Sequence, residues 1–124
     1  MNYLLMIYQN EAEYGKIDAD TSRKMMEEYG VFTQSIIQSG NFKAGDRLQP
    51  TTTATTVRVR DGKTLTTDGP FAETREQLGG YYIVEAADLD EALAIAERIP
   101  PARYGTIEVR PVMEISGLPD QGQA

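Results

Sequence analysis

The sequence predicts a single α+β domain built from one sheet and two helices. Its 124 residues, 40% hydrophobic and 25% charged, have the length and composition of one globular domain. Strand-like apolar stretches and two segments of helical periodicity follow one another as strand, helix, strands with a hairpin, strand, helix and strand. We therefore expect one domain over residues 1–115 and a flexible tail over residues 116–124, which are rich in Gly, Pro and Gln.

The first part of the chain predicts a strand and a long helix. Residues 3–8 form an unbroken apolar run of strand length, which indicates a central strand covered on both faces. The polar residues 9–20 are expected to form a loop. Over residues 21–39 apolar side chains recur at helical spacing, so we expect an amphipathic helix with Asp20 or Thr21 as its cap.

The remaining part predicts a hairpin, further strands and a second helix. Asp61 and Gly62 separate residues 55–60 from residues 63–67, and this dipeptide favours the tight turn of a two-residue β-hairpin. The other expected elements are a short strand near Arg47, a strand over residues 81–86, a helix capped by Asp88 and Glu91 and ended by Pro100, and an edge strand over residues 106–112.

This order of elements is typical of a ferredoxin-like split βαβ sandwich with an inserted β-hairpin. Two helices can cover only one face of such a sheet. An uncovered apolar face would be a larger patch than soluble monomers usually expose, so we expect a homodimer whose sheets face each other. The first strand carries apolar side chains on both faces, with Tyr3, Leu5 and Ile7 on one and Leu4, Met6 and Tyr8 on the other.

The charge and the missing residue types exclude several classes of function. Twelve basic and nineteen acidic residues give a net charge of −7, the wrong sign for a protein that binds the phosphate backbone of nucleic acids. No cysteine and no histidine occur, which excludes disulfides, thiolate or imidazole catalysis and metals with Cys or His ligands. We therefore assign no cofactor and no metal, while oxygen ligands stay available for a hard cation. No apolar run reaches membrane-spanning length and no signal peptide is recognisable, so we expect a cytoplasmic protein.

The stretch over residues 68–82, DGPFAETREQLGGYY, holds the main candidate functional residues. Pro70 restricts Gly69 and suits the first position of a short helix, so the chain is expected to turn sharply there. Glu73 and Glu76, three residues apart, would then share one face of a single helical turn. Such a pair performs acid/base chemistry where burial raises one pKa, or it simply interacts with the dipole at the start of a helix.

One hypothesis is that the protein binds a small organic anion near this turn. Asp68 would act as the catalytic base or as an orienting acceptor. An arginine would pair with the anion, and a tyrosine would form an aromatic wall beside two glycines where backbone can approach a ligand. The candidate ligand-binding residues are Arg47, Glu73, Glu76, Tyr82 and Arg110.

Two further charged surfaces are open to two interpretations each. Residues 63–124 carry five basic and eleven acidic residues, and five of the acidic ones cluster over residues 85–97, around the second helix. This acidic surface is solvated or meets a basic protein partner. Pairing across the hairpin places three cations on one face, where they bind an anion or protect an exposed strand edge from aggregation. These cations are Arg58, Arg60 and Lys63.

Residues 68–76, DGPFAETRE, resemble the motif of the DGPFAETKE family, which is part of the wider YCII-related group. Arg75 stands where that motif has Lys. The resemblance covers about residues 1–115 and implies a dimeric α/β barrel of two ferredoxin-like subunits. In the wider group a His and an Asp are the suspected acid and base, and this chain has no His to take that role.

The resemblance leaves two functions open, and with them the question of whether the chain is an enzyme. One is a small-molecule site at or near a dimer interface, with acid/base chemistry by carboxylates. The alternative is a non-enzymatic dimeric module associated with an extracytoplasmic-function sigma factor, because members resemble proteins whose genes neighbour those of such factors. The expected partners are a second copy, a small molecule and a protein of transcription regulation, with neither nucleic acid nor membrane.

Overall fold

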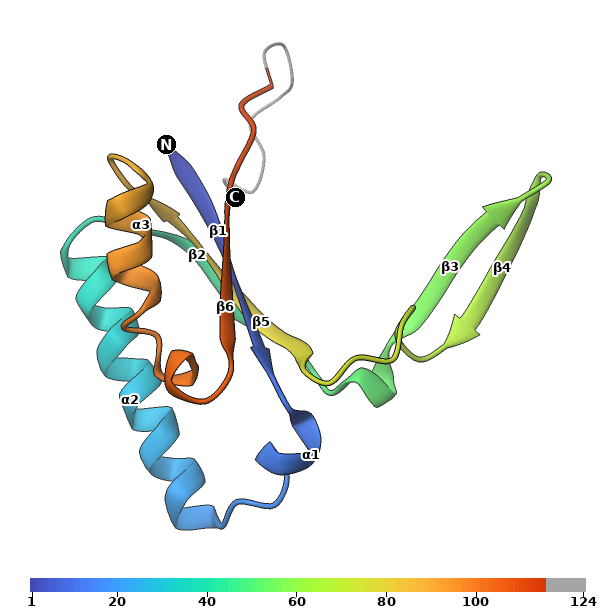
Figure 1. Ribbon diagram of the computed structural model, residues 1–124, viewed down its shortest axis with the longest axis horizontal. Coiled ribbons are helices and arrows are strands. Elements are labelled where there is room, and N and C mark those ends of the chain that lie inside the picture. The colour runs from blue at the N-terminus through green and yellow to red at the C-terminus, as the bar shows by residue number, and fades with distance from the viewer. Residues whose placement is uncertain (116–124) are drawn as a thin grey trace.

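The computed structural model describes residues 1–115 and contains strands, α-helices and short 3-10 turns (Figure 1). In chain order they are β1 Asn2–Gln9, α1 Glu11–Tyr14, α2 Ala19–Gln38, β2 Phe42–Arg47, η1 Thr51–Thr53, β3 Thr55–Arg60, β4 Lys63–Asp68, β5 Gln77–Glu85, α3 Leu89–Ala96, η2 Pro100–Arg103 and β6 Thr106–Pro111.

Four strands form one antiparallel sheet in the order β2-β5-β1-β6. The predicted central position of the first strand is therefore confirmed, and so is the edge position of the last strand, where Pro111 needs no ladder partner for its nitrogen. With two long helices on this sheet, the architecture is a mixed α+β fold consistent with the predicted ferredoxin-like arrangement.

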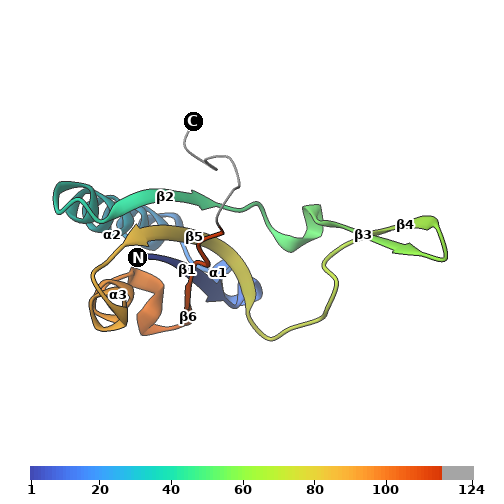
Figure 2. The same ribbon diagram turned by 90° about the horizontal axis from the view of Figure 1, so that it is seen from above.

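The helices α2 and α3 cover one face of this sheet (Figures 1 and 2). Side chains alternate along each strand, so one set from β1 and β5 points toward the helices and is buried. The helices supply the matching apolar stripes. The core is formed by Tyr3, Leu5, Ile7, Tyr29, Phe32, Ile36, Tyr82, Val84, Ala86, Ala92, Ile95, Ala96 and Ile99.

The opposite face, here called the open face, has no helix on it among residues 1–115 (Figures 1 and 2). Its centre is apolar, because the alternate side chains of β1 and β5 point that way and lie across from one another in register. Polar side chains of the two edge strands flank this centre. The central residues are Leu4, Met6, Tyr8, Tyr81 and Ile83, and the flanking ones are Asp46, Glu108 and Arg110.

The strands β3 and β4 form a separate two-stranded ribbon, here called the arm, which pairs with no other strand. The predicted turn is confirmed, since Asp61 and Gly62 both have positive φ, 52° and 73°. The predicted clustering of cations is confirmed too: Arg60 pairs with Lys63, and Arg58 shares their face opposite Leu65. The arm projects away from the body on the side of the sheet opposite the helices (Figures 1 and 2).

The ends of the helices differ partly from expectation. Helix α2 begins two residues earlier than predicted, with Asp18 as its cap, whose carboxylate accepts a hydrogen bond from the Thr21 nitrogen at 2.7 Å. The predicted capping box at the start of α3 forms, because the side chain of Asp88 accepts a hydrogen bond from the Glu91 nitrogen at 2.9 Å. The Glu91 carboxylate in turn accepts from the nitrogen of Ala87 at 2.7 Å.

Three expectations about other segments are wrong. The expected loop over residues 9–20 contains α1, whose Asn10 side chain accepts a hydrogen bond from the Glu13 nitrogen at 3.1 Å. The two glycines at 79 and 80 lie inside β5 rather than before it. No helical turn follows Pro70, because residues 69–76 adopt bends and irregular backbone, so a helix does not bring the two glutamates together.

Among residues 1–115 no helix has both the length and the apolar character that crossing a bilayer requires. The predicted tail over residues 116–124 lies outside the described residues.

Two glycine substitutions should change stability in opposite directions. A Cβ at Gly105 would overlap the backbone carbonyl oxygen of Tyr8, so Gly105→Ala should lower the free energy of unfolding by about 2–3 kcal/mol. A Cβ at Gly30, inside α2, would meet nothing within 4 Å, so Gly30→Ala should raise it by about 0.5–1 kcal/mol. Urea unfolding of both variants checks this pair, and equal effects would contradict the described packing.

Candidate functional site

The guanidinium of Arg47 lies at the end of β2 among aromatic and thioether side chains. It is 5.6 Å from the ring centre of Tyr29 on α2, close enough for a cation–π interaction. It donates hydrogen bonds to the sulfur of Met26 and, at 3.3 Å, to the hydroxyl of Tyr14 on α1. Two helices, α1 and α2, therefore supply the side chains that contact this guanidinium.

No carboxylate among residues 1–115 forms an ion pair with Arg47. Two acidic side chains line the same grooves as Arg47 but are hydrogen-bonded to other residues. Glu11 accepts hydrogen bonds from the nitrogen and the hydroxyl of Thr51 at 2.9 and 2.7 Å, and Asp46 accepts one from the Tyr81 hydroxyl at 2.7 Å. The positive charge of Arg47 is thus free to meet an external anion.

Arg47 lines two adjoining grooves. The first, of about 500 Å³, lies between α1, the segment after β2 and the start of β5, and is lined among others by Tyr14, Leu48 and Gln77. The second, of about 380 Å³, lies between α2 and β2, and Tyr29 and Tyr82 contribute to its wall. Both volumes fall in the range of small-molecule sites.

Glycines shape the second groove. Gly30 on α2 leaves open space at its wall. On β2, Gly45 lets the Tyr82 ring lie against the backbone, because a Cβ there would come within 2.7 Å of the ring. The Tyr82 hydroxyl hydrogen-bonds Thr33 Oγ1 at 2.6 Å, and the ring meets Phe32 edge-on at 5.3 Å. Tyr82 is therefore a rigid wall.

The tyrosines around Arg47 are electrostatically linked to it. Burial is the main cause that raises the pKa of Tyr29 well above its usual value, with Tyr104 adding to the rise and Arg47 opposing it. The pKa of Tyr104 is raised as well, again chiefly by burial and then by Tyr14. These phenols stay neutral at physiological pH and offer hydroxyl groups beside the guanidinium.

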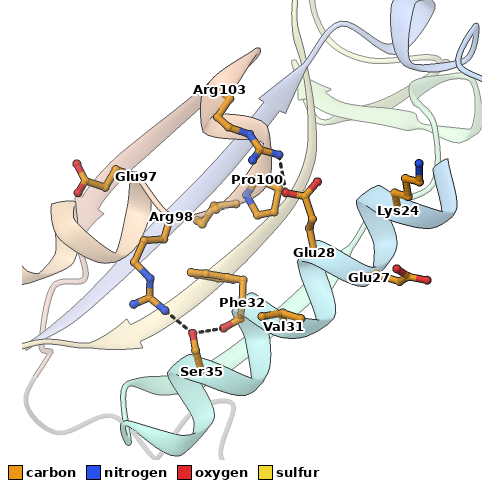
Figure 3. Close-up of a pocket in the computed structure, with 11 residues that line it drawn as sticks. Lys24, Glu27, Glu28, Val31, Phe32, Ser35, Glu97, Arg98, Pro100 and Arg103 are labelled. Carbon is orange, nitrogen blue, oxygen red and sulfur yellow. Dashed lines mark hydrogen bonds and ion pairs between the residues drawn. The ribbon is translucent and has the colours of Figure 1, made fainter. Parts of the chain in front are cut away.

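A third groove, between α2 and the α3–η2 segment, is larger but its cations are occupied (Figure 3). It measures about 770 Å³. Arg103 donates to Glu28 at 2.7 Å, and Arg98 bonds Ser35 while lying 5.5 Å from the ring centre of Phe32. Because both guanidinium groups already have protein partners, this groove is a weaker candidate for an anion than the one at Arg47.

The YCII-related domain family matches residues 1–116 of the chain. The protein belongs to this family. An uncharacterised protein of Rhizobium meliloti (strain 1021) is similar to it, with 36% identity over 114 residues that cover 90% of this chain and 92% of the relative. The YCII-related resemblance seen in the sequence is therefore confirmed over the whole described domain.

In this YCII-related chain only some predicted site residues come together. Arg47 and Tyr82 line the same groove. Asp68 is exposed at the end of β4, where it pairs with Thr55 of the arm, and Glu73 is exposed on the loop that follows. Asp68 thus lies at the base of the arm, and neither Asp68 nor Glu73 lines the grooves at Arg47.

The other two predicted residues lie elsewhere. Glu76 accepts a hydrogen bond from Thr106 Oγ1 at 2.8 Å, which ties the end of the motif loop to β6. Arg110 is exposed on the open face, across from Leu4. Among residues 1–115 no group of three or more His, Cys, Asp or Glu side chains is arranged to hold a metal ion.

Sequence reasoning missed Tyr14 and Tyr29 as neighbours of Arg47. Tyr29 was assigned to the core stripe of the helix, and Tyr14 to a loop. The signal for α1 is Asn10 followed three residues later by Glu13, an N-terminal capping pattern. The approach of these side chains to Arg47 depends on the packing of three elements, which no local pattern encodes.

The raised pKa of Tyr29 should make stability fall in alkali. Below about pH 10 the phenol is protonated in the folded and the unfolded state, so it contributes no pH dependence. Above that pH the unfolded chain loses this proton while the folded protein keeps it, and stability falls by about 1.4 kcal/mol per pH unit. Urea unfolding from pH 9 to 12 should show a shallower fall in Tyr29→Phe, and equal slopes would contradict the burial of this hydroxyl.

Proposed function

We propose that this YCII-related protein binds a small organic anion in the grooves at Arg47. The observation that carries the proposal is a guanidinium held in place by Tyr14, Tyr29 and Met26, with no carboxylate partner among residues 1–115. Arginine pairs with planar carboxylates through two parallel hydrogen bonds, so a carboxylate is the favoured anion.

The walls of the grooves favour an aromatic or otherwise planar body on that anion. The second groove presents Tyr29 and Tyr82, and Gly30 leaves room beside them. Aromatic rings pack well against such walls, while hydroxyl groups at the margin supply hydrogen bonds. The ligand class that fits is therefore an aromatic carboxylate.

For the residues that lie together, the proposed activity is binding. Asp68, the predicted base, lines neither groove and lies at the base of the arm in the same chain. A catalytic role for Asp68 therefore requires that a second copy bring its arm to the site.

The proposal includes a homodimer in which the open faces of two copies pack together. Its support is the composition of that face, whose centre holds Leu4, Met6 and Ile83 while Glu108 and Arg110 lie at one margin. An apolar centre with a polar rim is the usual anatomy of a protein interface. Opposite charges at the rim allow a twofold contact to be complementary to itself.

Binding of benzoate, compared with acetate and inorganic phosphate, tests the anion site. Benzoate should shift the NMR resonances of Tyr29, Tyr82 and Gly30, and Arg47→Gln should weaken this binding by at least about tenfold. Arg103→Gln is the matched control, since Arg103 is paired with Glu28 in the third groove, and should leave the affinity unchanged. Equal affinity of the Arg47→Gln variant and the wild type would contradict the proposal.

A steric variant separates the groove from its charge. Gly30→Leu adds a side chain to the open wall of the second groove without altering Arg47. It should weaken benzoate binding while acetate, which needs only the guanidinium, is affected less. Unchanged benzoate binding would place the ligand body outside this groove.

A second candidate function is the association with a transcription-regulatory partner, and the exposed side of α3 favours it. Leu89 and Leu93 are 47% and 46% exposed there and lie beside Asp90, with Glu97 at the end of the helix. An apolar patch among acidic residues fits a partner with a basic rim.

Charge reversal on α3 tests this second function against an extracytoplasmic-function sigma factor of the source organism. Asp90→Lys with Glu97→Lys should abolish its recovery in a pull-down with the purified protein. Glu91 is left intact because its carboxylate accepts a hydrogen bond from the nitrogen of Ala87. Glu73→Lys with Glu114→Lys, two exposed positions outside α3, is the control with the same change of net charge. Equal recovery by the double variant would contradict the assignment.

A further inference from the structure

The arm formed by β3 and β4 is a two-stranded ribbon that stands apart from the other strands of residues 1–115. It pairs with no other strand and stands on the side of the sheet opposite the helices (Figures 1 and 2). An isolated two-stranded hairpin is at best marginally stable in water. Its valines lie largely in solvent, with Val57 and Val59 both 59% exposed.

The two faces of the arm differ in chemistry. The register places Val57 and Val59 on one face, opposite Thr66 and Thr64, and we call this the valine face. The other face is basic, with three cations and one leucine. This segregation is expected of a strand pair that packs on something through one face and stays in water on the other. The basic face carries Arg58, Arg60, Lys63 and Leu65.

The base of the arm is closed by hydrogen bonds between its own two strands. The nitrogen of Gly69 donates to the carbonyl oxygen of Ala54 at 2.7 Å, and Thr56 Oγ1 donates to the carbonyl oxygen of Gly69 at 2.7 Å. Gly69 has a φ of 102°, which a residue with a side chain rarely adopts. The first residues of the DGPF motif thus close the base of the arm and end its second strand.

We propose that the arm is a clasp whose valine face packs on the body of a second copy of this chain. The inference rests on the homodimer proposed above, in which that copy covers the open face. The arm projects on the same side of the sheet as the open face (Figures 1 and 2). A second copy that covers the open face therefore lies on the same side of the sheet as the arm.

Charge favours the same occupant. The arm, residues 55–68, carries three basic and two acidic residues, whereas the rest of the chain carries nine basic and seventeen acidic ones. The arm of one copy is therefore attracted to the acidic body of the other. A nucleic acid, which the basic face alone would suit, would be repelled by that same body.

The clasp would also bring Asp68 close to the second copy. Asp68 lies opposite Thr55, on the valine face rather than on the basic face. When the valine face packs on the second copy, this carboxylate turns toward that copy as well. Any acid/base role of Asp68 would then act on a ligand held by the other subunit.

Sedimentation equilibrium of the full chain tests the clasp. The double variant V57T/V59T keeps β-branched residues but puts hydroxyl groups on the valine face, and should weaken dimerisation by at least about tenfold. Leu65→Thr, a comparable loss of apolar surface on the basic face, should change it by less than about threefold. Equal dimer affinity of V57T/V59T and the wild type would overturn the clasp.

Amide hydrogen exchange of the wild type gives a second readout that needs no variant. Amides of β3 and β4 should exchange slowly at protein concentrations above the dissociation constant of the dimer and quickly at concentrations below it. Fast exchange in a populated dimer would overturn the clasp and leave the pairing of open faces standing. A wild type that stays monomeric at millimolar concentration would overturn both, whereas binding of benzoate at Arg47 is measured independently of either.

Discussion

The structure depends on one constraint, which is that two helices can cover only one face of a four-stranded sheet. On the covered face α2 and α3 bury the side chains of β1 and β5 and form the core. On the other face no helix of residues 1–115 lies over Leu4, Met6 and Ile83. The covered face supplies the core of the subunit, and the apolar centre of the open face is the basis of the homodimer proposed above.

The Arg47 site lies where this covering becomes incomplete. At the end of the edge strand β2, beyond the main core, α1 and α2 bring Tyr14 and Tyr29 to the guanidinium of Arg47. A cation placed there is held by rings and a thioether rather than by carboxylates. This leaves both its charge and the adjoining grooves available to an anion.

Local patterns predicted the local features well. The unbroken apolar run over residues 3–8 predicted the central strand, Asp61 and Gly62 predicted the turn of the arm, and the cap at Asp88 predicted the start of α3. The prediction of a helical turn after Pro70 was wrong, because proline permits the start of a helix without requiring one.

The candidate site was harder to predict, because its members come from α1, α2 and β2. Arg47 and Tyr82 were named from the sequence, but their neighbours Tyr14 and Tyr29 are set by tertiary packing. The motif acids, in turn, were expected at the same site as Arg47, but Asp68 lies at the base of the arm and Glu76 is hydrogen-bonded to Thr106 of β6. The residues of a sequence motif predict a turn reliably. They do not predict how far apart two separate segments lie, because that distance depends on the order of the strands in the sheet.

Isotope-filtered NMR on a mixture of ¹³C-labelled and unlabelled chains tests the central claim most directly. The account predicts intermolecular contacts between the methyl groups of Leu4, Met6 and Ile83 of a labelled subunit and protons of its unlabelled partner. If those methyl groups show only contacts within their own chain and exchange magnetisation with water, the open face is solvated and the account is contradicted.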